Sequence, residues 1–298
     1  MCGIVGLFIK SKSLEPELGQ HFAPMLETMC SRGPDSAGFA IYDEEAPKGF
    51  FKLSLHHPTP GYDWGPVARS LEAAGSTGIT YEVKANHALF QAPLPEAPLL
   101  SHLESQWPKV TVMSAGTRIQ IMKDMGTPQE VVARFDVRAM GGSHAIGHTR
   151  MATESAVTTA GSHPFSTGMD LCLVHNGSLS NHNRLRQNLA RDGIRFHTEN
   201  DTEVAAGYLT WRLRQGLSLR DSLNASLKDL DGFYTFAVGT RDGFAVLRDP
   251  IACKPAVMAE TEDYVAMASE YRSLAELPGV EKARLWEPEP GVVYSWTR

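Results

Sequence analysis

The sequence opens with Met1-Cys2-Gly3-Ile4-Val5-Gly6-Leu7-Phe8-Ile9, and the fold is organised around this stretch. Residues 2–9 are short, apolar and β-branched, which predicts a buried strand. If Met1 is removed, Cys2 carries a thiol and a free α-amine on one residue. A terminal amine has a pKa of about 7.7–8.0 and can serve as a base near neutral pH, and a thiolate is a strong nucleophile. The stretch therefore indicates either a nucleophile at the start of a strand or an ordinary first strand with an incidental cysteine.

Length and charge narrow the class of protein. With 298 residues, 42% of them hydrophobic and 21% charged, the chain is long enough for one large or two medium domains. A net charge of −6 argues against a surface for nucleic acid or an anionic membrane. No apolar run approaches the roughly 18–20 residues that span a bilayer, and the first ten residues lack the basic start of a signal peptide. We therefore expect a cytoplasmic protein that binds neither nucleic acid nor membrane.

Nothing in the sequence indicates a cofactor or a metal. The four cysteines are widely spaced and form no C-x-x-C pair, which argues against a zinc site or a disulfide framework. The three beyond Cys2 are interpreted as small packing residues. No glycine-rich phosphate-binding pattern opens a helix. We expect no cofactor and no metal.

The order of predicted elements favours mixed sheets with helices outside them. Strands are predicted at 39–42, 145–150, 171–175, 256–259, 264–268 and 291–296, with a hairpin over 233–247, and helices at 14–31, 181–192, 201–215 and 219–230. Asn176-Gly177 follows one strand as a turn signal. Strands, then helices, then strands again argue against a doubly wound parallel sheet.

Residues 43–140 are less regular. They predict a strand at 78–83, a helix at 84–91 and a strand or hairpin at 109–122. Thr127 followed by Pro128 predicts a capped helix that runs to residue 135.

Six short motifs nevertheless occur in one order along the chain: Cys2–Gly6, Arg32–Asp35, His148–Arg150, Ser162–Pro164, His175–Gly177 and Asn200–Glu203. Each is weak alone, but together they resemble the glutaminase domain of the class II glutamine amidotransferases, which hydrolyse glutamine with an N-terminal cysteine. Later segments, Leu247–Pro250, Lys254-Pro255 and Ala268–Glu270, are similar to the amidophosphoribosyltransferase and glutamate synthase branches.

This resemblance covers residues 1–42 and 144–275. It implies an α+β fold, a four-layer α-β-β-α sandwich of the N-terminal-nucleophile hydrolase type. It also implies a single glutamine amidotransferase type-2 domain over residues 2–298, with an insertion at about 43–140.

The resemblance assigns the catalytic roles to Cys2, Asn176 and Gly177. Cys2 is the nucleophile. The Asn176 side-chain amide and the Gly177 backbone N–H are the donors for the oxyanion that forms when the thiolate attacks a carboxamide. The alternative for Asn176-Gly177 is a plain hairpin turn.

The substrate-binding roles fall to Arg150, Thr153, Asp201 and Arg32. The family match makes Arg150, helped by Thr153, the partner of the glutamine α-carboxylate, which suits a planar guanidinium. Asp201 is the partner of the α-ammonium, with a helix N-cap as the alternative. Arg32 is expected near the nucleophile as a supporting residue, or else paired with Asp35. Three histidines in these motifs are far apart in the sequence, and we interpret them as packing or hydrogen-bonding groups: His148, His163 and His175.

The chain stops soon after the glutaminase pattern, which leaves no room for a second catalytic domain of ~100–200 residues. We therefore expect a glutaminase subunit that supplies ammonia to separate synthase subunits containing flavin or an iron–sulfur cluster. The sequence is most similar to the standalone amidotransferase subunits of N-methylglutamate synthase and glutamate-synthase-like systems. The alternatives are an autonomous N-terminal-nucleophile amidase acting on another amide, and a non-catalytic subunit that binds glutamine.

Overall fold

The computed structural model describes residues 2–93, 96–151 and 157–298. At its centre lie two antiparallel sheets. The larger has the strand order β14-β12-β13-β1-β8-β2-β7 and comprises β1 (Gly3–Ile9), β2 (Ser36–Tyr42), β7 (Ile119–Met125), β8 (His144–Arg150), β12 (Val257–Glu260), β13 (Tyr264–Ala268) and β14 (Arg284–Trp286). The smaller has the order β15-β11-β10-β9 and comprises β9 (Cys172–Leu179), β10 (Gly232–Thr240), β11 (Gly243–Arg248) and β15 (Val293–Thr297).

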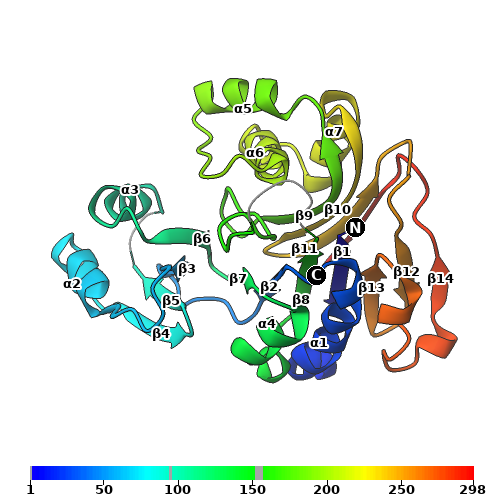
Figure 1. Ribbon diagram of the computed structural model, residues 1–298, viewed down its shortest axis with the longest axis horizontal. Coiled ribbons are helices and arrows are strands. Elements are labelled where there is room, and N and C mark those ends of the chain that lie inside the picture. The colour runs from blue at the N-terminus through cyan, green and yellow to red at the C-terminus, as the bar shows by residue number, and fades with distance from the viewer. Residues whose placement is uncertain (1, 94–95, 152–156) are drawn as a thin grey trace.

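Helices cover the outer face of each sheet (Figure 1). The seven-stranded sheet is covered by α1 (Leu18–Thr28) and α4 (Pro128–Arg134), and the four-stranded sheet by α5 (His182–Arg191), α6 (Asp201–Arg214) and α7 (Leu219–Asp229). Three apolar clusters fill the spaces between the four layers. The predicted α+β fold and its four-layer sandwich are confirmed.

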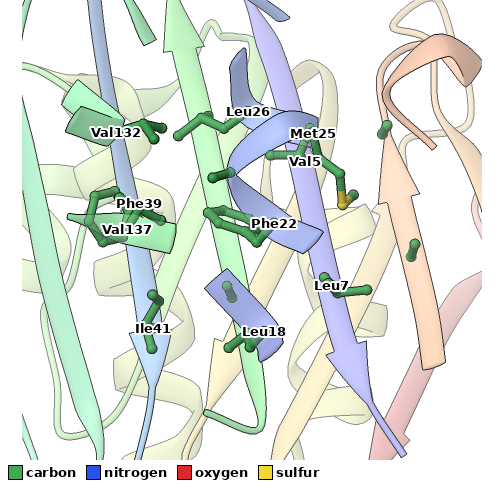
Figure 2. Packing of buried hydrophobic residues seen from close by; sticks show 14 of the residues in the cluster. Val5, Leu7, Leu18, Phe22, Met25, Leu26, Phe39, Ile41, Val132 and Val137 are labelled. Atoms are coloured by element: carbon green, nitrogen blue, oxygen red, sulfur yellow. The ribbon is translucent and has the colours of Figure 1, made fainter. Parts of the chain in front are cut away.

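Strand β1 shows why the opening stretch is apolar without interruption. Successive side chains of a strand point to opposite faces. Val5 and Leu7 accordingly pack under α1 with Phe22, as Figure 2 shows, whereas Ile4 and Phe8 belong to the cluster between the two sheets. All seven residues of β1 are buried. A central strand buried on both faces has no polar position, which is the pattern the sequence displays.

A third sheet lies beside this sandwich. It has the order β4-β5-β3-β6 and comprises β3 (Phe51–His56), β4 (Thr80–Lys84), β5 (His87–Ala92) and β6 (Thr111–Gly116), with α2 (Gly65–Ala73) and α3 (Glu96–Gln106). These elements share an apolar cluster of their own that includes Leu53, Leu55 and Phe90. We call residues 51–116 the inserted lobe; it projects from one end of the sandwich (Figure 1).

Two expectations for this part of the chain are corrected. The helix predicted at 84–91 is wrong, because Ala85 has a left-handed φ of 56° at a turn and β5 follows it. Along β5, Ala88, Phe90 and Ala92 are buried with a period of two, which is the signature of a strand. Residues 109–122 form no hairpin: β6 pairs with β3 in the lobe, and β7 pairs with β2 in the main sheet.

The expected insertion at 43–140 is wider than the lobe, because β7 and α4 belong to the sandwich. The division into one domain with an insertion remains a prediction.

The helix expected after Thr127 is confirmed, with Thr127 and Glu130 in a reciprocal capping box. Short 3₁₀ segments occur at η1 (Lys12–Glu17), η2 (Met29–Arg32), η3 (Val137–Ala139), η4 (Tyr271–Ser273) and η5 (Val280–Lys282). Within the described residues, every helix is too short or too polar to cross a lipid bilayer.

Candidate active site

The chain start lies at one end of the sandwich. Strand β1 runs between β13 and β8, and the pairing of Gly3 with Thr149 brings its beginning beside the end of β8. Gly3 has no room for a side chain, since an added Cβ would lie 2.8 Å from both Met29 Cβ and Thr149 Oγ1. The half-buried Cys2 directly precedes this crowded position.

Two side chains from distant parts of the sequence hold the Cys2 backbone. Its carbonyl oxygen accepts hydrogen bonds from Arg32 Nε at 3.0 Å and from Asn176 Nδ2 at 3.2 Å. Arg32 also donates from Nη1 to Glu270 Oε1 at 2.7 Å. The hydrogen bond from Arg32 lowers the pKa of Glu270, although burial acts in the opposite direction. Cys2, Arg32 and Asn176 therefore meet at one place, with Glu270 behind the guanidinium.

Asn176 and Gly177 lie inside β9, so the turn expected from this dipeptide is wrong. Gly177 pairs with Tyr234 and has a φ of 151°, a conformation that residues with side chains rarely adopt. An added Cβ there would lie 2.0 Å from the Phe233 carbonyl oxygen. The glycine is required by the close approach of β10, and it leaves the backbone beside Asn176 uncovered by a side chain.

Arg150 ends β8 and is nearly buried. Its carbonyl accepts a hydrogen bond from Asp35 N at 3.1 Å, and a Cβ added to Gly33 would meet the Arg150 nitrogen at 2.5 Å. The Arg32–Asp35 loop is thus packed directly on the end of β8. Thr153, the expected helper of Arg150, lies outside the described residues.

Asp201 is the first residue of α6, and the alternative that it caps the helix is wrong. The N-cap is Asn200, whose side chain accepts from Thr202 N at 2.9 Å. Asp201 instead accepts from Leu179 N at 2.9 Å and lies 3.6 Å from His175 Nδ1. Burial opposes ionisation of this carboxyl, but the His175 and Leu179 interactions prevail and lower its pKa to about 2. The site therefore holds a carboxylate that is ionised at every physiological pH.

The three histidines of the motifs come together although they are far apart in sequence. The rings of His148 and His163 stack at 3.9 Å, and Thr202 Oγ1 lies 3.2 Å from His163 Nε2 and 3.1 Å from His175 Nδ1. His148 Nε2 also lies 3.1 Å from the His175 carbonyl oxygen. Burial lowers the pKa of His148 to about 3 and that of His163 well below its usual value. The neutral rings of His148 and His163 connect β8 with β9 and the 158–164 segment with α6 through hydrogen bonds.

Within the described ranges, no group of three or more His, Cys, Asp or Glu side chains is arranged to hold a metal ion. The polar groups that meet the backbone of the half-buried Cys2 are the Arg32 guanidinium, which is paired with Glu270, and the Asn176 side-chain amide.

Sequence reasoning missed the pairing of Glu270 with Arg32. The Ala268–Glu270 segment was noted as a motif, but the two residues are 238 positions apart and nothing local indicates their contact. It also missed Ser269, whose Oγ accepts from Ile4 N at 2.9 Å and ties β13 to the chain start. Only the register of β1 against β13 and β8 makes these contacts visible.

Comparison with known proteins shows similarity to glutamine amidotransferases. A sequence profile described as a glutamine amidotransferase domain matches residues 148–276. The glutamine amidotransferase-like protein GlxB of Rhizobium meliloti is 58% identical over 297 residues, which cover 99% of this chain and 98% of that protein. A putative glutamine amidotransferase of Methanothermobacter thermautotrophicus is 33% identical over 305 residues, which cover 98% of each chain.

A solved structure is also similar. It is the glutamine phosphoribosylpyrophosphate amidotransferase of B. subtilis complexed with ADP and GMP, with a TM-score of 0.63 and 22% sequence identity. The match covers 99% of this chain but 47% of that one, so this chain spans about half its length. The similarity shows that the two proteins share a fold over the length of this chain.

Proposed function

Because this chain belongs to the class II glutamine amidotransferases, we propose that it hydrolyses L-glutamine to glutamate and ammonia with Cys2 as the nucleophile. The observation that carries the proposal is the pair of hydrogen bonds from Arg32 and Asn176 to the Cys2 carbonyl. They fix the backbone of the nucleophile within reach of the amide that would serve as the oxyanion donor. Pre-positioning of this kind supplies much of the rate enhancement in acyl transfer.

The chemistry follows from removal of Met1. The free α-amine of Cys2, through a water molecule, takes the thiol proton, and the thiolate attacks the side-chain carbonyl carbon of glutamine. Asn176 Nδ2 and Gly177 N–H stabilise the negative oxygen of the tetrahedral intermediate. The amine then returns the proton to the leaving nitrogen, the C–N bond breaks, and ammonia departs from a γ-glutamyl thioester. Water hydrolyses the thioester to glutamate and restores the thiol.

The far end of the substrate is bound by charge. In the proposed complex the Arg150 guanidinium binds the α-carboxylate in a bidentate manner, with Thr153 assisting, and the Asp201 carboxylate binds the α-ammonium. The depressed pKa of Asp201 supports this role, because the carboxylate stays charged wherever the ammonium does.

We further infer that the ammonia is delivered to a separate synthase subunit of the N-methylglutamate synthase or glutamate-synthase-like kind. This inference is supported by the sequence similarity to the amidotransferase subunits of those systems, together with the 58% identity to the glutamine amidotransferase-like protein GlxB. Affinity capture of the chain from its own cells tests the inference, with flavin- or iron–sulfur-containing synthase subunits as the expected partners. Recovery of the chain alone from cells that make such a synthase would contradict it.

The hydrolytic function is tested by replacing the nucleophile. Cys2→Ala should release no measurable glutamate or ammonia from glutamine, whereas Cys253→Ala, which removes an exposed cysteine elsewhere, should leave turnover unchanged. Near-normal turnover in Cys2→Ala would reject the proposal. Wild-type protein that binds glutamine without turnover, even with a partner present, would favour the regulatory alternative. Hydrolysis of several unrelated amides would favour the autonomous amidase.

A further inference from the structure

A buried lysine organises a loop that borders the active site. Lys123 lies in β7, on the side of the sandwich that carries the inserted lobe, and is 3% exposed. Its Nζ donates hydrogen bonds to three backbone carbonyls of one loop, those of Ala160 at 3.1 Å, Ser162 at 2.7 Å and Pro164 at 3.1 Å. We call residues 158–164 the carbonyl loop. An ammonium has three donors, so the loop uses all of them.

The carbonyl loop can approach strand β2 closely because Gly38 has no side chain. A Cβ added to Gly38 in β2 would lie 2.2 Å from the His163 carbonyl oxygen and 2.4 Å from Lys123 Cβ. Burial lowers the pKa of Lys123 to about 7, and the carboxylate of Glu203 acts in the opposite direction. The three carbonyls favour the protonated form, since only an ammonium can donate to all of them.

The other side of the carbonyl loop faces the residues assigned to substrate binding. A Cβ added to Gly161 would lie 3.7 Å from Arg150 Nη1, and Asn200 Nδ2 approaches the Gly161 carbonyl oxygen at 3.5 Å. His163 in the same loop contacts Thr202. The loop is therefore wedged between Lys123 on one side and, on the other, Arg150 and the first turn of α6, where Asp201 lies.

We propose that Lys123 is a positioning residue for glutamine binding: it holds the carbonyl loop so that the Arg150 guanidinium and the Asp201 carboxylate keep their separation. This inference rests on the proposed glutaminase function. Lys123 touches none of the reacting atoms. Loss of the Lys123 side chain should therefore weaken binding of the α-carboxylate and α-ammonium equally in the ground state and the transition state. Such a change raises KM and leaves kcat nearly unchanged.

The same strand connects the loop to the inserted lobe. Asp124, next to Lys123, accepts from Thr159 Oγ1 at 2.7 Å and from Asn86 Nδ2 at 3.0 Å. Asn86 lies in the turn between β4 and β5 of the lobe. A cavity of about 610 Å³ separates the lobe from the carbonyl loop, with Lys123 and Ala160 among its lining residues. The lobe is thus joined to the substrate-binding side of the sandwich through a continuous series of hydrogen bonds.

The experiment compares two buried lysines. In Lys123→Met, KM for glutamine should rise about tenfold or more while kcat stays within about threefold, because three charge-assisted hydrogen bonds are lost from the loop. Lys52→Met is the matched control: Lys52 is 9% exposed and binds Asp43 and the Glu44 carbonyl, away from the carbonyl loop. It should leave KM unchanged.

The outcomes distinguish a failure of the positioning role of Lys123 from a failure of the proposed glutaminase function. A wild-type protein that does not hydrolyse glutamine contradicts the glutaminase function itself. An active wild type with an unchanged KM in Lys123→Met contradicts only the positioning role, as does a lower kcat and thermal stability without a change in KM. If Lys123→Met does not fold, Lys123→Gln decides the matter. It keeps an amide donor for the loop but loses the charge and the third donor, so KM should rise about threefold; an unchanged KM would overturn the proposal.

Discussion

The sandwich and the inserted lobe are built from similar sheets and helices, yet the sequence describes them very differently. The sandwich carries all six motifs, which lie in strands β1, β8 and β9, in the segments 32–35 and 162–164, and at the start of α6. The lobe has its own apolar cluster but none of the residues assigned to chemistry. Chemistry demands particular side chains, whereas packing accepts any apolar residue of suitable size. The comparison therefore predicts that equal changes in the two regions have unequal effects on turnover.

The largest effect is expected from Asn176. Asn176→Ala removes a donor to the developing oxyanion and should lower kcat about 10²–10³-fold, measured as glutamate release at saturating glutamine. The control is Asn183→Ala, an exposed asparagine of α5, which should have no effect. A kcat within about threefold of wild type in Asn176→Ala would remove this residue from the mechanism.

A smaller loss is expected at Arg32. Arg32→Met removes a donor to the Cys2 carbonyl and leaves Glu270 without its guanidinium partner, so the nucleophile loses part of its fixed position. We expect kcat to fall about 10- to 100-fold, in line with the effect of misplacing a reacting group by about 1 Å. Glu270→Gln keeps a hydrogen-bond acceptor for Arg32 and should cost less. An equal loss in both variants would mean that charge, not position, is what Arg32 supplies.

The lobe should tolerate a comparable change with little loss of turnover. Leu55→Ala in the lobe and Leu26→Ala under the main sheet each remove a side chain that is 0% exposed. Each should lower the free energy of unfolding by about 2–5 kcal/mol, measured by denaturant titration. Below the unfolding transition, Leu55→Ala should keep kcat within about twofold, because its cluster holds no catalytic residue. A tenfold loss of kcat there would show that the lobe takes part in the chemistry.

The smallest effect concerns pH. The pKa of Asp201 is about 2 and that of His148 about 3, so neither group changes charge between pH 5 and 8 in the folded protein. These two groups should then leave no step on the acid side of the kcat/KM profile, where activity rises as the Cys2 amine loses its proton. A step near pH 6.5 that is abolished in His148→Gln would contradict this account, because it would require His148 to titrate normally.

The same shifts set the pH dependence of stability. An unfolded His148 titrates near pH 6.5, whereas the folded one stays neutral to about pH 3. The contribution of His148 to the free energy of unfolding is complete above about pH 6.5. It is lost progressively as the pH falls from about 6.5 to about 3. For Asp201 the contribution is complete above about pH 3.9 and is lost as the pH falls toward 2.

Much of the sandwich could be predicted because its signals are local. The apolar run of β1 and the hairpin of β10 and β11, paired from Thr240 to Gly243, follow directly from side-chain pattern and turn residues. The lobe could not, since β5 is a short run of alternating residues whose burial depends on strands elsewhere in the lobe. The dipeptide Asn176-Gly177 is typical of a turn when it is taken alone. A glycine is needed inside β9 because the neighbouring strand β10 approaches it closely, and no local sequence pattern indicates that approach.

The candidate site shows the same limit. The motifs predicted which residue types the proposed chemistry needs. They did not predict the contact of Arg32 with Glu270 or the hydrogen bonds of Lys123 to the carbonyl loop, because these join residues that are far apart in sequence. Such contacts are set by sheet register, which no single segment encodes.

The central claim is that a processed Cys2 performs the attack on glutamine. It is tested most directly with a glutamine analogue that carries a diazoketone in place of the carboxamide, followed by peptide mass spectrometry. The account predicts one adduct, on the sulfur of Cys2 in a chain that lacks Met1, with glutamine protecting against its formation. An adduct on Cys30 or Cys253 instead, or active protein that retains Met1, would contradict it.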